Sequence, residues 1–103
     1  MVVSQLINDN NNPAMNQFII HLDNGDVAFQ SYSSRVCEIR NNGSQVVFGR
    51  NWDYSRTTMK HLNIFLRDFG KGYLTGAATI RKAIKDGVSE NDYVSVLYDE
   101  NMV

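Results

Sequence analysis

The sequence predicts an α+β fold: an antiparallel β-meander of four to five strands, with two helices packed on one face, in the order β-β-β-β-α-α-β. Two observations support this class. Apolar and polar residues alternate within residues 17–50, where Asn-Gly pairs mark turns, and apolar residues then recur at helical spacing within residues 54–86. Consecutive strands joined by short turns favour an antiparallel arrangement, and the helices are expected to cover one sheet face.

The chain has 103 residues, which suffices for one domain, and 43% of them are hydrophobic, which indicates a packed core. We expect a single domain over residues 15–103, preceded by an Asn-rich extension, residues 1–14. Residues 8–13 have the composition of a turn or a mobile linker. The apolar segment Val2–Ile7 is open to three interpretations: an edge strand, loose packing or disorder.

Four strands are expected at residues 17–22, 27–32, 35–40 and 45–50. The segment Asp23–Asp26 predicts a hairpin with a type I′ turn, because Asn-Gly supports the positive φ angles that this turn requires. A second turn is expected at residues 41–44, and Ser33-Ser34 is a weaker break.

A helix is expected at about residues 54–69, capped by Asp53 or Ser55 and ended by Gly70. A second helix is expected at about residues 76–86, capped by Thr75 and followed by Gly87. A last strand follows at residues 93–98. The apolar stripes of the two helices are Met59, Leu62, Phe65, Leu66 and Phe69 in the first, and Ala77, Ile80 and Ile84 in the second.

The start of the first helix is the candidate binding site, because backbone N–H groups at a helix N-terminus attract anions. Hydroxyls and a guanidinium in the first turn would add contacts to a phosphate, and the rings of Trp52 and Tyr54 could stack on a base. The alternative is a purely structural role, in which Asp53 or Ser55 only caps the helix, Trp52 belongs to the core and Arg56 pairs with Asp53. The candidate phosphate- or partner-binding residues are Trp52, Tyr54, Ser55, Arg56, Thr57, Thr58 and Lys60.

Charge is distributed unevenly along the chain. All ten basic residues lie within residues 35–85, whereas residues 1–34 and 86–103 carry acidic residues only. This distribution predicts either separate basic and acidic faces or acidic ends that fold back to neutralise the middle.

The titratable residues form no catalytic or metal-binding pattern. His21, His61 and Cys37 have no partners at ligand spacing, and a metal site would need at least three such groups. We expect no enzyme activity, no metal and no cofactor. A single cysteine, no signal peptide and no membrane-spanning run favour the cytoplasm.

Residues 29–69 resemble a family of small uncharacterised proteins from phages, prophages and plasmids of Gram-positive bacteria. The segments that carry the resemblance are Phe29-Gln-Ser-Tyr-Ser33 and Trp52-Asp-Tyr-Ser-Arg-Thr-Thr58, which continues into Lys60-His-Leu62 and Phe65-Leu66. The resemblance implies an accessory protein of a mobile element, made in the bacterial cytoplasm, and assigns no catalytic role to any residue.

Two functions follow as expectations. The first is binding of a host protein, for example as an inhibitor of a host defence system such as CRISPR, for which the charge distribution would provide a steering surface. The second is binding of nucleic acid or nucleotide phosphate through the basic middle segment and residues 53–58. A homodimer is plausible for either function, because an exposed edge strand needs a partner or protection.

Overall fold

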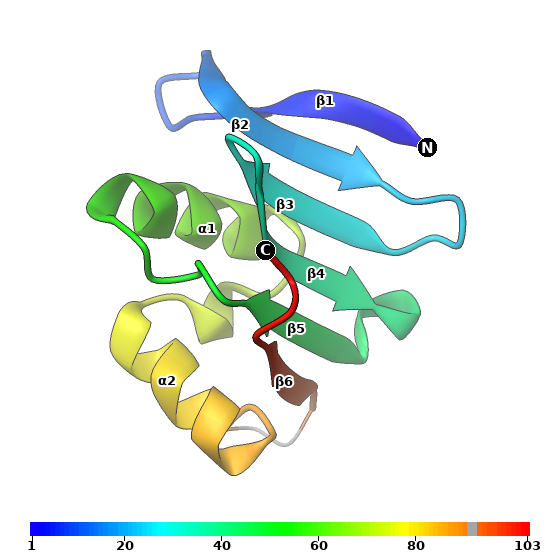
Figure 1. Cartoon of the computed structure of the whole chain (residues 1–103), viewed down its shortest axis with the longest axis vertical. Coiled ribbons are helices and arrows are strands. Elements are labelled where there is room, and N and C mark those ends of the chain that lie inside the picture. The colour runs from blue at the N-terminus through cyan, green and yellow to red at the C-terminus, as the bar shows by residue number, and fades with distance from the viewer. Residues whose placement is uncertain (91–92) are drawn as a thin grey trace.

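The computed structural model describes residues 1–90 and 93–103 and confirms the α+β class (Figure 1). A six-stranded sheet in the order β1-β2-β3-β4-β5-β6 carries two α-helices. The elements are β1 (Val2–Ile7), β2 (Pro13–His21), β3 (Val27–Ser31), β4 (Ser34–Arg40), β5 (Gln45–Gly49), α1 (Arg56–Asp68), α2 (Ala77–Asp86) and β6 (Ser95–Asp99), with short 3-10 turns η1 (Asn41–Gly43) and η2 (Gly72–Leu74).

The sheet differs from the expected meander in strand number and direction. It has six strands rather than four to five. Strands β1 to β5 are antiparallel, but β6 pairs with β5 in parallel, Val46 opposite Val96. The cause is the long connection through α1 and α2, which returns the chain to the end of the sheet where β5 begins.

The additional strand is β1, so Val2–Ile7 adopts the edge-strand arrangement. Val3 lies opposite Ile20 of β2. The turn that follows is closed by Asn8, whose backbone N–H donates to the Asn12 carbonyl at 2.8 Å and whose side-chain oxygen accepts from the N–H groups of Asn10 and Asn12. The Asn-rich segment therefore forms a hydrogen-bonded turn between β1 and β2.

The hairpin turns use left-handed backbone conformations. At residues 23–26 the predicted type I′ turn is wrong: Gly25 has φ +92° and donates to the Leu22 carbonyl, but Asn24 is not among the positive-φ residues. A type I turn followed by a left-handed glycine fits this pattern. The second predicted turn is confirmed, with positive φ at Asn41, Asn42 and Gly43.

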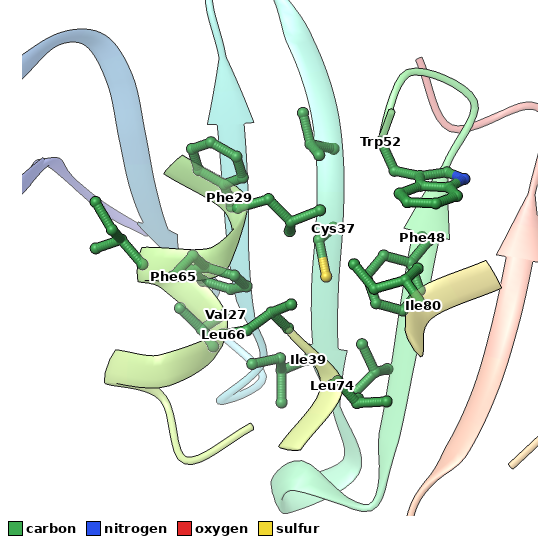
Figure 2. Close-up of a cluster of buried hydrophobic side chains, with 14 of the residues drawn as sticks. Val27, Phe29, Cys37, Ile39, Phe48, Trp52, Phe65, Leu66, Leu74 and Ile80 are labelled. Carbon is green, nitrogen blue, oxygen red and sulfur yellow. The ribbon is translucent and has the colours of Figure 1, made fainter. Parts of the chain in front are cut away.

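Both helices lie on the same face of the sheet, and the core lies between them and the strands (Figure 1, Figure 2). Phe65 of α1 stacks on Phe29 of β3 with ring centroids 5.7 Å apart. Ile80 of α2 is fully buried near Phe48 of β5 (Figure 2). In α1 the predicted residues Leu62, Phe65 and Leu66 are buried, Met59 and Phe69 are partly buried, and Ile64 is buried as well. In α2 the buried residues are Ile80 and Ala83, with Ala77 and Ile84 only partly buried.

The structure shows which residue caps each helix at its N-terminus. Ser55 caps α1, accepting from the Thr58 N–H at 3.1 Å. The predicted Thr75 cap of α2 is wrong: its hydroxyl donates to the Gly72 carbonyl at 2.8 Å, and Gly76 is the capping residue without a side-chain bond. The Gly76 N–H instead donates to Oδ1 of Asn63 in α1, at 3.0 Å.

A backbone clamp closes the end of β5. A Cβ at Gly49 would lie 2.6 Å from the carbonyl oxygens of both Arg35 and Met102, so only glycine fits there. The next residue, Arg50, donates its N–H to the same Met102 carbonyl at 2.9 Å. The C-terminal segment is thereby joined to the loop that leads into α1.

The charge distribution is partly neutralised within the fold. Glu38 is bonded to both Arg35 and Arg40, at 2.7 and 2.8 Å. Ion pairs also join Asp9 to Arg67 and Lys82 to Asp86, so acidic residues from both ends of the chain do meet the basic middle. Asp92 of the acidic C-terminal segment lies outside the described residues. Across the described chain, neither α1 nor α2 has the length and apolar character needed to traverse a bilayer.

Candidate functional site

A cavity of about 560 Å³ lies where the start of α1 meets the turn between β3 and β4. Two segments that are distant in sequence form it: residues 31–36, from the end of β3 into β4, and residues 51–58, from the loop after β5 into the first turn of α1. The lining residues are Ser31, Tyr32, Ser34, Val36, Asn51, Tyr54, Ser55, Thr57 and Thr58. All of these side chains are uncharged, and most carry a hydroxyl group.

The α1 side of the cavity is organised by Ser55. Its Oγ accepts from the Thr58 N–H and lies 3.1 Å from the Thr58 hydroxyl, while its carbonyl accepts from the Met59 N–H. The first N–H groups of a helix have no partner within the helix. Those of Arg56 and Thr57 therefore remain to be satisfied by water or by a ligand at this end of the helix.

The opposite wall is held by the β3–β4 turn. Tyr32 has φ +55°, a left-handed conformation that costs a non-glycine residue about 1–3 kcal/mol. Its N–H donates to the Asn16 carbonyl of β2 at 2.7 Å, which fixes the turn. Asn51 connects this wall to the loop before α1, because its side-chain amide donates to the Ser34 hydroxyl at 3.2 Å.

Two tyrosine rings at the cavity are open to solvent. Tyr32 is 61% exposed and Tyr54 is 78% exposed. One belongs to the β3–β4 turn and the other to the loop before α1. The site therefore combines a polar, uncharged hollow with two accessible aromatic side chains.

The structure brings four of the seven predicted site residues into this cavity: Tyr54, Ser55, Thr57 and Thr58. Trp52 lies instead in the core, 5% exposed, with its ring edge-on to Phe48. Trp52 is thus not an exposed stacking surface, and the core alternative holds for it.

The predicted basic residues lie outside the cavity. Arg56 is exposed and is not a lining residue. Lys60 lines a different hollow, together with Asn63 and Arg67. The alternative pairing of Arg56 with Asp53 is also absent among the ion pairs of the described residues. Asp53 pairs instead with Arg81, at 3.5 Å. The Arg81 guanidinium also lies 5.4 Å from the centre of the Trp52 ring.

Sequence reasoning missed five cavity residues: Ser31, Tyr32, Ser34 and Val36 on the strand side, and Asn51 in the loop before α1. The weak break at Ser33-Ser34 gave the turn but not its proximity to α1. The two segments that carry the resemblance, residues 29–33 and 52–58, do supply opposite walls of the cavity. The occurrence of both segments in the same resemblance was the one sequence feature that could have suggested that they form a common site.

The remaining titratable candidates lie elsewhere. Cys37 is fully buried, and burial, with a smaller effect of Glu38, raises the pKa of its thiol well above the ordinary value. His61 hydrogen-bonds through Nδ1 to the Thr57 carbonyl at 2.8 Å, and His21 packs against Phe69. Within residues 1–90 and 93–103, no three His, Cys, Asp or Glu side chains are grouped to hold a metal ion.

Comparison with protein families identifies a match. The sequence model of a family described as "family of unknown function (DUF8033)" matches residues 1–87. The chain belongs to this family. The matched region includes every cavity residue and runs from β1 through α2. No curated protein matches the chain. No solved structure matches it either.

Proposed function

We propose that the protein acts by binding and transforms no molecule. In this proposal it is an accessory protein of a phage or other mobile element of Gram-positive bacteria. In the bacterial cytoplasm it binds a host protein, for example a nucleic-acid-processing complex, and inhibits a host defence system such as CRISPR. The supporting observation is the pair of exposed tyrosines, Tyr32 and Tyr54, beside the uncharged, hydroxyl-rich cavity.

Tyrosine is suited to protein recognition because its ring offers a large contact area at low conformational-entropy cost and its hydroxyl forms hydrogen bonds. The cavity beside the rings adds side-chain hydroxyls and the Asn51 amide as further hydrogen-bonding groups. The wall that carries Tyr32 is fixed by its bond to Asn16, which limits the loss of freedom on binding.

The proposal is tested by a CRISPR-interference assay in a Gram-positive host, with the untagged chain expressed from a plasmid. We expect the wild type to restore plaque formation by a targeted phage and Tyr54→Ala to reduce that restoration at least about tenfold. The control is Tyr93→Ala, because Tyr93 is exposed to the same 78% but lies outside the cavity. Equal loss in both variants, or no restoration by the wild type in several interference systems, contradicts the proposal.

A second candidate function is binding of nucleotide phosphate or nucleic acid at the same helix start. It is supported by the Arg56 and Thr57 N–H groups and by the exposed guanidinium of Arg56 at this end of α1. In addition, Arg50, Lys60 and Lys71 form none of the ion pairs seen in the described residues.

This candidate is tested by fluorescence anisotropy with labelled single- and double-stranded oligonucleotides at several salt concentrations. Binding through phosphates weakens steeply with salt, because counterions are released. We expect Arg56→Ala to weaken binding and Lys85→Ala, a change on exposed α2 surface, to leave it nearly unchanged. Absence of binding at low salt contradicts the candidate.

A further inference from the structure

The two edges of the sheet are protected to different degrees. At β6 the outer edge is occupied as far as Val96 by the segment after α2: Val96 donates its N–H to the Gly87 carbonyl at 2.9 Å, and the Val94 carbonyl accepts from Ser89 at 3.0 Å. Val88 also forms a bridge with Ser95. These bonds use the main-chain groups with which another strand would pair.

The β1 edge has no such cover in the described chain. β1 pairs with β2 on one side, and no element follows it in the sheet order (Figure 1). Every second residue of an edge strand directs its N–H and C=O groups away from the sheet. The strand Val2–Ile7 contains neither a charged residue nor proline, the usual guards of an edge, and its one irregularity is a register shift between Gln5 and Ile7.

Apolar side chains are exposed along this edge. Val2 is 64% exposed and Val3 is 54% exposed, and Ile7 is exposed as well. On the sheet face away from the helices, Val3 borders a hollow of about 350 Å³ lined by Met1, Val3, Phe18, Ile20, Gln30 and Arg35. The edge therefore offers both unpaired main-chain groups and uncovered apolar area.

We infer that β1 is a dimerisation edge that pairs antiparallel with β1 of a second copy of this chain. An antiparallel pair around a two-fold axis is isologous, so one strand meets its own copy with the same side chains. The absence of charge in Val2–Ile7 means that two copies do not repel each other, and it provides no charge pattern that would select a different protein.

The geometry of the fold accommodates this pairing. A two-fold axis perpendicular to the sheet continues it to twelve strands, since each copy has six, and keeps the helices of both copies on one face. Figure 1 shows that β1 forms one edge of the sheet and that α2 lies near the other edge, beside β6. Neither helix therefore blocks the approach of a second copy to β1. The partner strand would also bring its apolar side chains to the rim of the Val3 hollow.

The first test is light scattering coupled to size exclusion, over a concentration series of the untagged chain. We expect a dimer mass for the wild type and, for Val3→Lys, at least about tenfold weaker association, because a lysine in the paired edge is costly to desolvate. The matched control is Leu97→Lys. Val3 and Leu97 are the two exposed ends of one cross-strand row, Val3–Ile20–Ala28–Glu38–Val47–Leu97, and Leu97 follows the covered part of the β6 edge.

The second test does not depend on how well the lysine variant folds. In Ser4→Cys the only accessible thiol is in β1, because Cys37 is fully buried. We expect mild oxidation to give a covalent dimer, which Asp53→Cys, at an exposed position remote from β1, does not give under the same conditions. A monomeric wild type at the highest attainable concentration, or dimers lost in Leu97→Lys and kept in Val3→Lys, overturns the inference. These outcomes are independent of the proposed defence inhibition, since they need no host component.

Discussion

The two helices begin in different surroundings, although both are amphipathic and both pack on the same sheet face. The start of α1 is capped from within by Ser55 and opens onto a cavity. The start of α2 has no side chain of its own as a cap, and its Gly76 N–H is taken by Asn63 of α1. A helix N-terminus is therefore available for recognition only where neighbouring elements leave it uncovered, and its dipole alone does not decide this.

The largest expected effect comes from breaking the packing of α1 on the sheet. Phe65 is fully buried between Phe29 and Phe69, with ring centroids 5.7 and 5.1 Å away. Phe65→Asp places a charge there without a partner, and we expect a loss of more than about 4 kcal/mol and an unfolded chain. Circular dichroism checks this, with Lys60→Glu as the exposed control on the same helix. A cooperatively melting Phe65→Asp variant would show that α1 is less central than its burial indicates.

The contact between the helices is tested by Asn63→Ala. Removal of the Asn63 oxygen leaves the Gly76 N–H without its acceptor, and we expect a loss of about 1–3 kcal/mol in urea unfolding. Asn63→Asp keeps an acceptor at that position and should lose less. Equal losses in both variants would mean that the start of α2 does not depend on this bond.

The cap of α1 is tested by Ser55→Ala. Loss of an N-cap hydroxyl costs about 0.5–2 kcal/mol, and we expect about 1 kcal/mol here. Ser55→Asp should restore most of that stability, because aspartate caps as well as serine does. If the alanine variant is as stable as the wild type, then Ser55 serves the cavity rather than the helix.

The smallest effect concerns Cys37, which lies between the side chains of α1 and those near α2 (Figure 2). Because burial raises the pKa of its thiol in the folded state, the folded chain keeps this proton above pH 9.0, where the unfolded chain loses it. The contribution of this thiol to the free energy of unfolding is thus fully present below that pH. It falls as the pH rises, by at most about 1.4 kcal/mol per pH unit. Urea unfolding of Cys37→Ala should show a shallower decline in alkali than the wild type. Identical slopes would assign the decline to other groups.

Local sequence signals predicted the elements that depend on neighbouring residues. The helix α1 followed from apolar spacing and a serine cap, and the turn at residues 41–44 followed from its Asn-Asn-Gly composition. The direction of β6 did not follow, because pairing across the whole α1–α2 connection is a non-local choice. The fate of Val2–Ile7 stayed open for the same reason, since its pairing with β2 depends on how the Asn-rich segment turns.

The candidate site was predictable only on its helix side. Tyr54, Ser55, Thr57 and Thr58 were identified because they are contiguous with a helix start. The other wall comes from a turn about twenty residues earlier, and no periodicity or charge pattern links the two segments. Trp52 was ambiguous in sequence because a tryptophan before a helix suits a binding surface and a core equally well; its burial beside Phe48 decides the matter.

The clamp at Gly49 has a mechanical consequence. Because the Met102 carbonyl rests on Gly49 and bonds to Arg50, tension applied at residue 103 enters the molecule beside the loop that carries Asn51 and Tyr54. Part of the load passes through the Met102–Arg50 hydrogen bond to the loop at the rim of the cavity. A tether at that end of the chain therefore pulls next to the proposed binding surface.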